Sequence, residues 1–432
     1  MGKKESTYTH TQMNILIVNT SERQGGAAIA AHRLMDALLQ QGHTVRMLVR
    51  DRHTSRPEVV SLPSDLRRKW QFLWERFVIW AGNRFSRRNL FAVDIANAGT
   101  DITGLEVFRQ ADVIHLHWIN QGMLSLADIR KILRSGKPVV WTMHDMWPST
   151  AVCHHARECN AYYTACSRCP YLNAGGFLCD LSSRTFRQKQ QTYALAPITF
   201  VACSRWLRGR VEQSALLRGN RITDIPNPID IVRFAPADSV EARRRLGLPS
   251  GKRLILFGSA KITDKRKGID YFVESCRLLA DGDPALRETL GVVVYGRNSE
   301  EIKDLLPFEV FPLNYISSEE VLVDVYNAVD LYVTPSLEEN LPNTIMEAMS
   351  CGTPCVGFNV GGIPEMIDHL HNGYVAQYES AADLAKGICW VLGADDGMDC
   401  PGKARQKVEE NYSQEAVARK YVKLYQQILS HE

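Results

Sequence analysis

Residues 335–376 read PSLEENLPNTIMEAMSCGTPCVGFNVGGIPEMIDHLHNGYVA. Within this stretch two carboxylates, Glu339 and Glu347, are separated by seven residues. Pro342 lies between them, and proline is well tolerated in the first turn of a helix. We therefore expect Glu339 in a loop and Glu347 on the helix that follows, with Gly352 ending that helix before a short buried strand.

The two carboxylates would flank the N-terminus of one helix, which favours a ligand with both hydroxyl and phosphate groups. Carboxylates accept hydrogen bonds from sugar hydroxyls, while a helix N-terminus attracts phosphate through its free N–H groups and positive dipole end. The sequence therefore predicts a sugar-phosphate pocket. The alternative is that Glu339 and Glu347 are solvated carboxylates near a helix start.

The same stretch resembles the EX7E signature of the retaining glycosyltransferases of family GT4, which have the GT-B fold. The surrounding PS…E, EAM.CG.P and GG.PE patterns match that family as well. The resemblance implies that Glu339 contacts the transferred sugar and that Glu347 binds the ribose of the nucleotide. Asn343 and Thr344, at the expected helix start, are assigned to donor binding on the same basis.

Length and composition are typical of a globular protein with more than one domain. A chain of 432 residues suits two or three domains, and its net charge of +3 is too small to predict a nucleic-acid partner. We find no run of 18 apolar residues, so a membrane-spanning helix is not expected. The first twelve residues are polar and lack the apolar core of a signal peptide, so the eleven cysteines are expected to be reduced thiols in the cytoplasm.

Strands and helices alternate along the chain, which predicts an α/β protein with doubly wound parallel sheets. The resemblance to GT-B proteins implies two Rossmann-like domains with the site in the cleft between them. The proline-rich residues 225–228 are interpreted as the hinge. The expected organisation is a disordered tail at 1–12, an N-terminal acceptor-side domain at 13–224 with a Cys-rich insertion at 151–180, a nucleotide-sugar-binding domain at 225–411, and a C-terminal helix at 412–432 that crosses back to the first domain.

A glycine pair, Gly25 and Gly26, lies between the first predicted strand and the first predicted helix. Glycine lets a backbone approach a ligand closely, and the helix start adds N–H donors. The segment is not a G-x-G-x-x-G dinucleotide fingerprint. Because GT4 enzymes often carry such a pair facing the donor diphosphate, the resemblance implies donor binding, and a simple tight turn is the alternative.

Cations follow a predicted strand in the second half, in the sequence LFGSAKITDKRKG at residues 256–268. This resembles the GR…KG segment of GT4, in which an Arg and a Lys neutralise the leaving diphosphate. Lys267 matches the Lys, and Lys261 takes the place of the Arg, although a Lys lacks the bidentate fork of a guanidinium. With these fixed cations no metal cofactor is required for catalysis.

The segment VWTMHD at residues 140–145 places His144 just past the C-terminal end of a strand, where open α/β sheets bind ligands. It resembles the tLHD segment of GT4, whose His lies near the donor sugar, and a structural hydrogen bond is the alternative. Asp145 is expected to cap or orient. His115 and His117, two apart on one strand face, are interpreted as structural.

Four cysteines form the pattern C-x5-C-x6-C-x2-C, and only the last pair has the spacing typical of zinc knuckles. One interpretation is a structural zinc site in which His154 or His155 could replace a thiolate. Free thiols are the alternative, and an iron–sulfur cluster is the third. The four residues are Cys153, Cys159, Cys166 and Cys169.

Residues 66–88 combine aromatic side chains at helical spacing, such as Trp70, Trp74 and Phe77, with seven Lys or Arg residues and the single Glu75. This pattern is typical of an amphipathic helix on an anionic membrane surface. The alternative is that the apolar stripe packs on the protein's own sheet.

The resemblance implies a metal-independent, hexosyltransferase-type glycosyltransferase that uses a UDP- or GDP-sugar and a glycan or lipid-linked acceptor. The resemblance implies retention of configuration and a role in envelope polysaccharide synthesis, in the cytoplasm or peripherally on the inner face of the cell membrane. The alternatives are a nucleotide-sugar epimerase of GT-B fold and a non-catalytic subunit of a glycosyltransferase complex.

Overall fold

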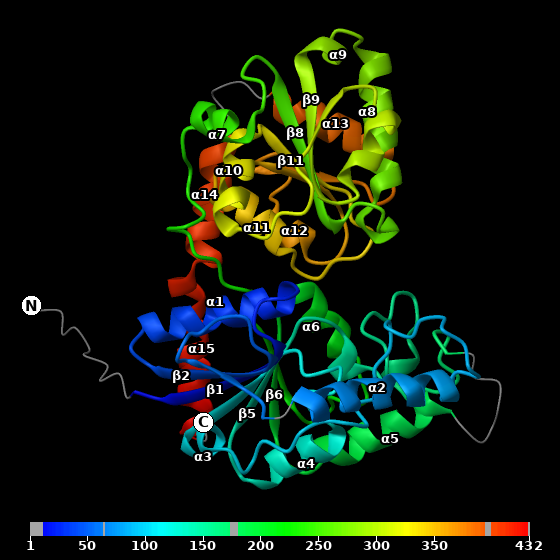
Figure 1. The fold of residues 1–432 in the computed structure, drawn as a ribbon, viewed down its shortest axis with the longest axis vertical. Helices are drawn as coiled ribbons and strands as arrows, with labels where there is room; N and C mark the ends of the chain where they lie inside the picture. The colour runs from blue at the N-terminus through cyan, green and yellow to red at the C-terminus, as the bar shows by residue number, and fades with distance from the viewer. Residues whose placement is uncertain (1–11, 64, 173–179, 394–398, 431–432) are drawn as a thin grey trace, which may run out of the picture. The chain divides into compact units, whose positions relative to one another are not determined.

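The computed structural model describes residues 12–63, 65–172, 180–393 and 399–430 (Figure 1). The chain divides into two compact units, and each has its own parallel sheet. The first unit comprises Met1–Ala202, Arg208–Ile225 and Ala418–Glu432, and the second comprises Cys203–Leu207 and Pro226–Val417.

The first unit contains a seven-stranded sheet in the order β3-β2-β1-β4-β5-β6-β7, and every pairing is parallel. Its central strands are buried apolar runs, as expected for a sheet covered on both faces. The strands are β1 (Asn14–Ser21), β2 (Thr44–Asp51), β3 (Val59–Ser61), β4 (Val113–Leu116), β5 (Val139–Met143), β6 (Ile198–Ala202) and β7 (Arg221–Asp224).

The last helix, α15 (Gln414–Leu429), packs on this first sheet. The Tyr421 hydroxyl lies 2.8 Å from Thr142 Oγ1, and the Tyr425 hydroxyl lies 2.7 Å from His115 Nδ1. The other helices around the first sheet are α1 (Gly26–Gln40), α2 (Asp65–Gly82), α3 (Glu106–Gln110), α4 (Leu126–Arg134), α5 (Leu181–Tyr193) and α6 (Arg205–Val211).

The second unit contains a six-stranded parallel sheet in the order β10-β9-β8-β11-β12-β13. The strands are β8 (Arg253–Lys261), β9 (Leu290–Arg297), β10 (Glu309–Pro312), β11 (Leu331–Thr334), β12 (Cys355–Phe358) and β13 (Gly373–Ala376). The helices are α7 (Ser239–Leu246), α8 (Ile269–Gly282), α9 (Leu286–Thr289), α10 (Glu319–Ala328), α11 (Asn343–Ser350), α12 (Ile363–Met366), α13 (Ala381–Leu392) and α14 (Cys400–Asn411).

Apolar cores cover both faces of the second sheet. Leu254 and Leu256 of β8 belong to one buried cluster, and Ile255 and Phe257 belong to the other. Successive strand residues point to opposite faces, so a continuous apolar run supplies both cores.

The predicted fold class is confirmed, because both units are doubly wound parallel sheets with helices. The helix predicted after Pro342 begins at Asn343 with Pro342 as its N-cap, and Gly352 follows its end with a φ of 78°. Strand β8 extends beyond its buried apolar run at Leu254–Phe257, because its polar end continues to pair with β9 as far as Lys261 and Arg297.

Candidate active site

In the second unit, the predicted donor-binding residues follow two adjacent strands. Strands β8 and β11 are neighbours, but the chain proceeds from β8 toward β9 and from β11 toward β12, on opposite sides. Such a topological switch point is where open α/β sheets bind ligands, at the carboxyl ends of the strands. Lys261 ends β8, and the loop carrying Glu339 connects β11 to α11.

The structure brings together Lys267 and Glu339, which lie 72 residues apart in the sequence. Lys267 Nζ forms an ion pair with Glu339 Oε1, and Ser336 Oγ donates to the same oxygen at 3.3 Å. Lys267 lies in the short 3-10 helix Lys265–Lys267, directly after β8. Lys261 is exposed, and among the described residues its ammonium group joins neither of these side chains.

Two glycines allow the Glu339 loop to take this position. Gly268, with a φ of 72°, lies so close to the loop that an added Cβ would be 1.8 Å from the Pro335 carbonyl oxygen. Gly361, with a φ of 60°, has the same relation to the Glu339 carbonyl oxygen, again at 1.8 Å. Glycine is therefore needed at Gly268 and Gly361 for two reasons: the backbone has a positive φ, and another segment of backbone lies too close to allow a Cβ.

Glu347 lies on α11 and is buried, with its side chain oriented by tyrosines that the sequence analysis did not identify. The Tyr326 hydroxyl of α10 donates to Glu347 Oε2 at 3.0 Å, and the Tyr295 hydroxyl of β9 lies 3.2 Å from that of Tyr326. Burial raises the pKa of both tyrosines, so they remain protonated and able to donate. Only the tertiary fold reveals these partners.

The start of α11 is held by further side chains. Thr344 Oγ1 accepts a hydrogen bond from the Tyr332 hydroxyl at 3.0 Å, and Asn343 Oδ1 accepts one from Asn227 Nδ2 at 3.4 Å. Pro342 is the N-cap and supplies no side-chain acceptor to the first amides of the helix. An anion is the chemical group that this helix start would accept.

Glu365, in the quoted G-G-I-P-E segment, has a supporting role that sequence reasoning missed. Its carboxylate accepts hydrogen bonds from the backbone N–H groups of Arg205 and Trp206, at 2.9 and 2.7 Å. Ser204 Oγ donates to Asn340 Oδ1 at 2.6 Å, next to Glu339. These bonds fix the loop that carries Glu339.

In the first unit, Gly25 and Gly26 follow β1, which is beside β4 at the switch point of that sheet. Gly25 has a φ of 92° and is the N-cap of α1. An added Cβ at Gly25 would meet no atom within 4 Å, so its conformation rather than lack of space calls for glycine here.

His144 follows β5 and contacts His117, which follows β4. His144 Nε2 lies 2.9 Å from His117 Nδ1, and the two rings are stacked. Burial lowers the pKa of His144 to about 4 and also lowers that of His117, so both rings are neutral at pH 7. His115 instead bonds to Thr142 and Tyr425, in a structural role. The contact of His117 with His144 was not foreseen.

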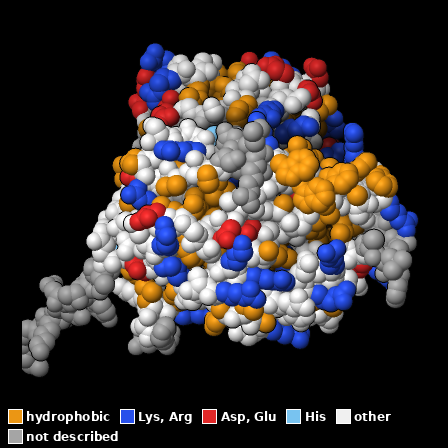
Figure 2. Space-filling model, turned by 60° about the horizontal axis from the view of Figure 1, so that its bottom comes forward, with side chains coloured by type: hydrophobic (Ala, Val, Ile, Leu, Met, Phe, Trp, Pro, Cys, Tyr) orange, Lys and Arg blue, Asp and Glu red, His pale blue; other side chains and the backbone are white. Residues whose placement is uncertain are grey.

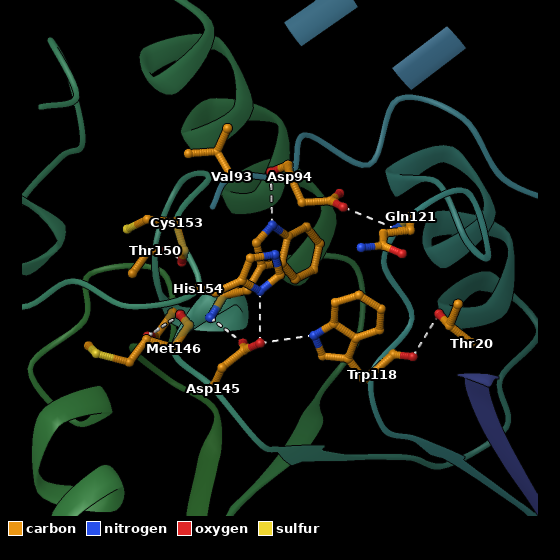
Figure 3. Close-up of polar contacts among 12 residues, drawn as sticks. Thr20, Val93, Asp94, Trp118, Gln121, Asp145, Met146, Thr150, Cys153 and His154 are labelled. Atoms are coloured by element: carbon orange, nitrogen blue, oxygen red, sulfur yellow. Dashed lines mark hydrogen bonds and ion pairs between the residues drawn. The ribbon is translucent and has the colours of Figure 1, made fainter. Parts of the chain in front are cut away.

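Asp145 is the centre of a partly buried hydrogen-bond network (Figure 3). Its Oδ2 accepts from Trp118 Nε1 at 2.9 Å and from His154 Nδ1 at 2.7 Å, and its Oδ1 accepts from the Trp147 N–H at 2.8 Å. Burial opposes ionisation of Asp145, but the charge and hydrogen bond of His154 hold its pKa at about 2. In return, Asp145 raises the pKa of His154 against the effect of burial, so the two form an ion pair.

The cysteine cluster lies next to this network. Cys153, Cys159, Cys166 and Cys169 line one cavity and form no disulfide. Across the described part of the chain, no group of three or more His, Cys, Asp or Glu side chains is arranged to hold a metal ion as it stands. His154 Nδ1 is occupied by Asp145, which removes that nitrogen from the set of candidate zinc ligands.

The apolar stripe of helix α2 faces outward. The alternative that this stripe packs on the protein's own sheet is therefore wrong. Trp70, Leu73, Trp74 and Phe77 are 65, 58, 43 and 50% exposed. The buried face carries polar side chains instead, such as Arg76, which pairs with Asp94 at 3.1 Å. Figure 2 shows hydrophobic side chains gathered at the surface on the side of the view where α2 lies in Figure 1. In the described residues, no helix is long and apolar enough to span a membrane.

Comparison with known proteins gives two family matches. Residues 24–233 match the family model described as Glycosyltransferase Family 4, and residues 251–394 match the one described as Glycosyl transferases group 1. The D-inositol 3-phosphate glycosyltransferase of Geodermatophilus obscurus is 35% identical over 185 residues, or 39% of each chain. The chain thus spans about two fifths of the length of this relative.

Solved structures resemble the whole chain. The sucrose-phosphate synthase of Thermosynechococcus elongatus has a TM-score of 0.66 at 17% identity, over 98% of this chain and 100% of that one. HepE of Anabaena, solved with UDP, has a TM-score of 0.62 at 15% identity, over 96 and 100%. HepE has also been solved with UDP-glucose. These neighbours establish the GT-B fold, and the family matches support a glycosyltransferase.

Proposed function

We propose that this protein is a retaining glycosyltransferase that moves a sugar from a nucleotide diphosphate sugar to a hydroxyl group of a glycan or lipid-linked acceptor. The observation that carries the proposal is the Lys267–Glu339 pair at the switch point of the second sheet, beside the start of α11. The structures of HepE with UDP and UDP-glucose support a nucleotide-sugar donor, and the proposed donor is a UDP- or GDP-sugar.

The donor would be held by groups of matching chemistry. Glu347, fixed by Tyr326, is suited to accept hydrogen bonds from the ribose hydroxyls. Glu339 is suited to the hydroxyls of the transferred sugar, and Lys267 to the diphosphate. A bound diphosphate would compete with Glu339 for the ammonium of Lys267. That exchange would release the carboxylate for the sugar.

The bond from the anomeric carbon to the diphosphate oxygen breaks, and its electron pair leaves with the diphosphate. Lys267, Lys261 and the N-terminal amides of α11 would stabilise the growing negative charge without a metal ion. The acceptor oxygen bonds to the same face of the anomeric carbon, and its proton passes to the departing phosphate. His144, neutral at pH 7, would act as a hydrogen-bonding group toward the sugar and not as an acid.

The exposed face of α2 supports a lipid-linked acceptor. Trp70, Trp74 and Phe77 would enter the interface of a bilayer, and the basic residues of 66–88 would favour anionic headgroups. The proposed setting is envelope polysaccharide synthesis at the inner face of the cell membrane.

An assay of nucleotide release tests the activity. The protein is incubated with UDP-glucose or GDP-mannose, with and without a lipid extract, and the released UDP or GDP is measured. We expect release with one donor class that increases with the extract, and about a hundredfold less release with Lys267→Ala. Donor turnover to a new sugar without acceptor would instead indicate an epimerase. Equal transfer with Glu339→Ala in a complex would indicate a non-catalytic subunit.

A further inference from the structure

The four cysteines of the C-x5-C-x6-C-x2-C pattern meet at one place in the first unit. Cys153, Cys159, Cys166 and Cys169 all line the same cavity, together with apolar groups such as Ala156. Cys153 and Cys169 are buried, and none of the four forms a disulfide. Residues spaced over this segment have thus been folded toward a shared space rather than scattered over the surface.

Hydrogen bonds fix the backbone at three of these cysteines. The Leu172 N–H donates to the Cys169 carbonyl oxygen at 3.0 Å, the Cys159 N–H donates to the Ala156 carbonyl oxygen at 2.9 Å, and Thr150 Oγ1 donates to the Cys153 carbonyl oxygen at 2.6 Å. These bonds hold the main chain and leave the side chains to turn about their own torsion angles. Cysteine binds metal as the thiolate, and a bound cation removes the thiol proton.

A buried cation lies beside the cluster. The Lys189 side chain is fully buried, its ammonium donates to the carbonyl oxygens of Trp147 and Thr150, and Cys153 and Cys166 are close enough to interact with it electrostatically. No carboxylate in the described residues forms an ion pair with it. Asp94 and Asp145 act on Lys189 electrostatically, but they pair with Arg76 and His154 respectively.

The ammonium also lies 3.3 Å from the centroid of the Trp147 ring. A buried ammonium held by carbonyl oxygens and a ring, without a carboxylate partner, favours a nearby anionic group. Four thiolates around one Zn²⁺ carry a net charge of minus two, and would supply the missing counter-charge to Lys189.

We propose that Cys153, Cys159, Cys166 and Cys169 bind one structural Zn²⁺ through four thiolates. The described side chains are not yet at coordinating distances, so binding requires the sulfurs to turn inward into the cavity that they share. Zinc then takes its usual tetrahedral geometry, with Zn–S distances of about 2.3 Å.

The site would stabilise a segment that supports His144. The neighbour of Cys153 in the sequence is His154, which pairs with Asp145, and Cys153 itself forms an isolated bridge with Val93. Closing the segment with zinc would hold this ion pair, and with it the end of β5. The metal site does not depend on the proposed activity, but its effect on sugar transfer rests on that activity.

The test is the metal content of the full-length protein, purified from medium supplemented with zinc and iron and measured by mass spectrometry. We expect about one Zn per chain in the wild type and in Cys389→Ser, a matched control with an exposed thiol on α13. The Cys166→Ser, Cys169→Ser double variant should contain at least tenfold less zinc per chain than the wild type. Absence of zinc from the wild type, an unchanged zinc content in the double variant, or iron in place of zinc would overturn the proposal.

A second measurement serves if the double variant fails to fold. The wild type is titrated with a mercurial reagent under native conditions, while a chromogenic chelator records zinc release. Release of zinc in proportion to the modification of four thiols supports the site. The proposal is contradicted if zinc is released when fewer than three thiols are modified. It is also contradicted if no zinc is released. Neither readout involves sugar transfer, so failure of the proposed function leaves this test intact.

Discussion

Both units place their predicted site residues at the ends of parallel strands, but these residues are charged in the second unit and neutral in the first. In the second unit, Lys267 and Glu339 are charged and partly exposed after β8 and β11. In the first unit, His144 and His117 are mostly buried, stacked and neutral after β5 and β4. In the proposed function, the second unit offers fixed charges to a diphosphate and the first unit offers hydrogen bonds to hydroxyl groups.

The largest expected effect comes from Glu339→Gln, which separates sugar recognition from diphosphate binding. Transfer should fall by about 10²–10³-fold, because an interaction with the reacting sugar is lost. Binding of free UDP or GDP should hold or improve, because Lys267 no longer pairs with a carboxylate. Calorimetric titration alongside the transfer assay checks both. Loss of nucleotide affinity together with transfer would show that the two functions are not separate. Glu379→Gln, at an exposed residue, is the matched control.

Gly361→Ala should have a somewhat smaller effect, through backbone displacement alone. The added Cβ would lie 1.8 Å from the Glu339 carbonyl oxygen, so the loop must shift. A displacement of about 1 Å can cost about a hundredfold in rate. We expect such a loss in kcat/KM, measured against Gly282→Ala, where an added Cβ meets no atom within 4 Å. If both variants retain wild-type activity, the position of Glu339 does not matter for transfer.

The neutral histidines of the first unit predict a loss of stability in acid. Burial lowers the pKa of His144 to about 4 and that of His115 to about 3, while a free histidine has a value of about 6.5. At a pH between the folded and unfolded pKa values, the unfolded chain binds more protons than the folded protein does. The free energy of unfolding therefore falls as pH drops from about 6.5 to about 4. Each such histidine contributes about 1.4 kcal/mol per pH unit.

Urea unfolding at several pH values measures this dependence. The variant His144→Asn should show a shallower slope, while His371→Asn, at an exposed position, should match the wild type. His154 acts in the opposite sense, because Asp145 raises its pKa and the stability that it adds is lost as pH rises through that value. An unchanged slope in His144→Asn would mean that folding does not lower the pKa of His144.

The smallest effect concerns the surface of α2. The double variant Trp74→Ser, Phe77→Ser should bind phosphatidylglycerol vesicles at least tenfold more weakly in a sedimentation assay, because both side chains are about half exposed and apolar. Val232→Ser, in the second unit and 86% exposed, is the control. Equal binding by all three proteins would assign membrane contact to another surface.

The sequence was sufficient for the elements whose signals are local. Strand β5 at Val139–Met143 ends just before His144, as predicted, and helix α15 at Gln414–Leu429 lies within the predicted C-terminal segment 412–432. Apolar runs and helical periodicity are properties of neighbouring residues. The resemblance assigned Lys267 and Glu339 to one donor site, but their ion pair was not predicted, because 72 residues separate them in the sequence.

Other features could not be read from the sequence, because they depend on distant contacts. Helical periodicity identified an apolar stripe on α2, but it does not show which face of the helix is buried. In the structure, Arg76 on the buried face pairs with Asp94, which is distant in the sequence. The tyrosine that orients Glu347 lies on a different helix, α10. His117 has the spacing of a structural residue, and only the pairing of β4 with β5 brings it to His144.

The central claim is that the switch point of the second unit binds a nucleotide sugar through Glu347, and a thermal-shift titration tests it most directly. UDP, GDP, ADP and their sugar conjugates are titrated into the wild type and Glu347→Ala, since a ligand that binds only the folded state raises the melting temperature. At one hundred times Kd the stabilisation is about 2.7 kcal/mol. We predict a rise with one nucleotide class that is lost in the variant. No rise with any nucleotide, or an equal rise in the variant, would contradict the account.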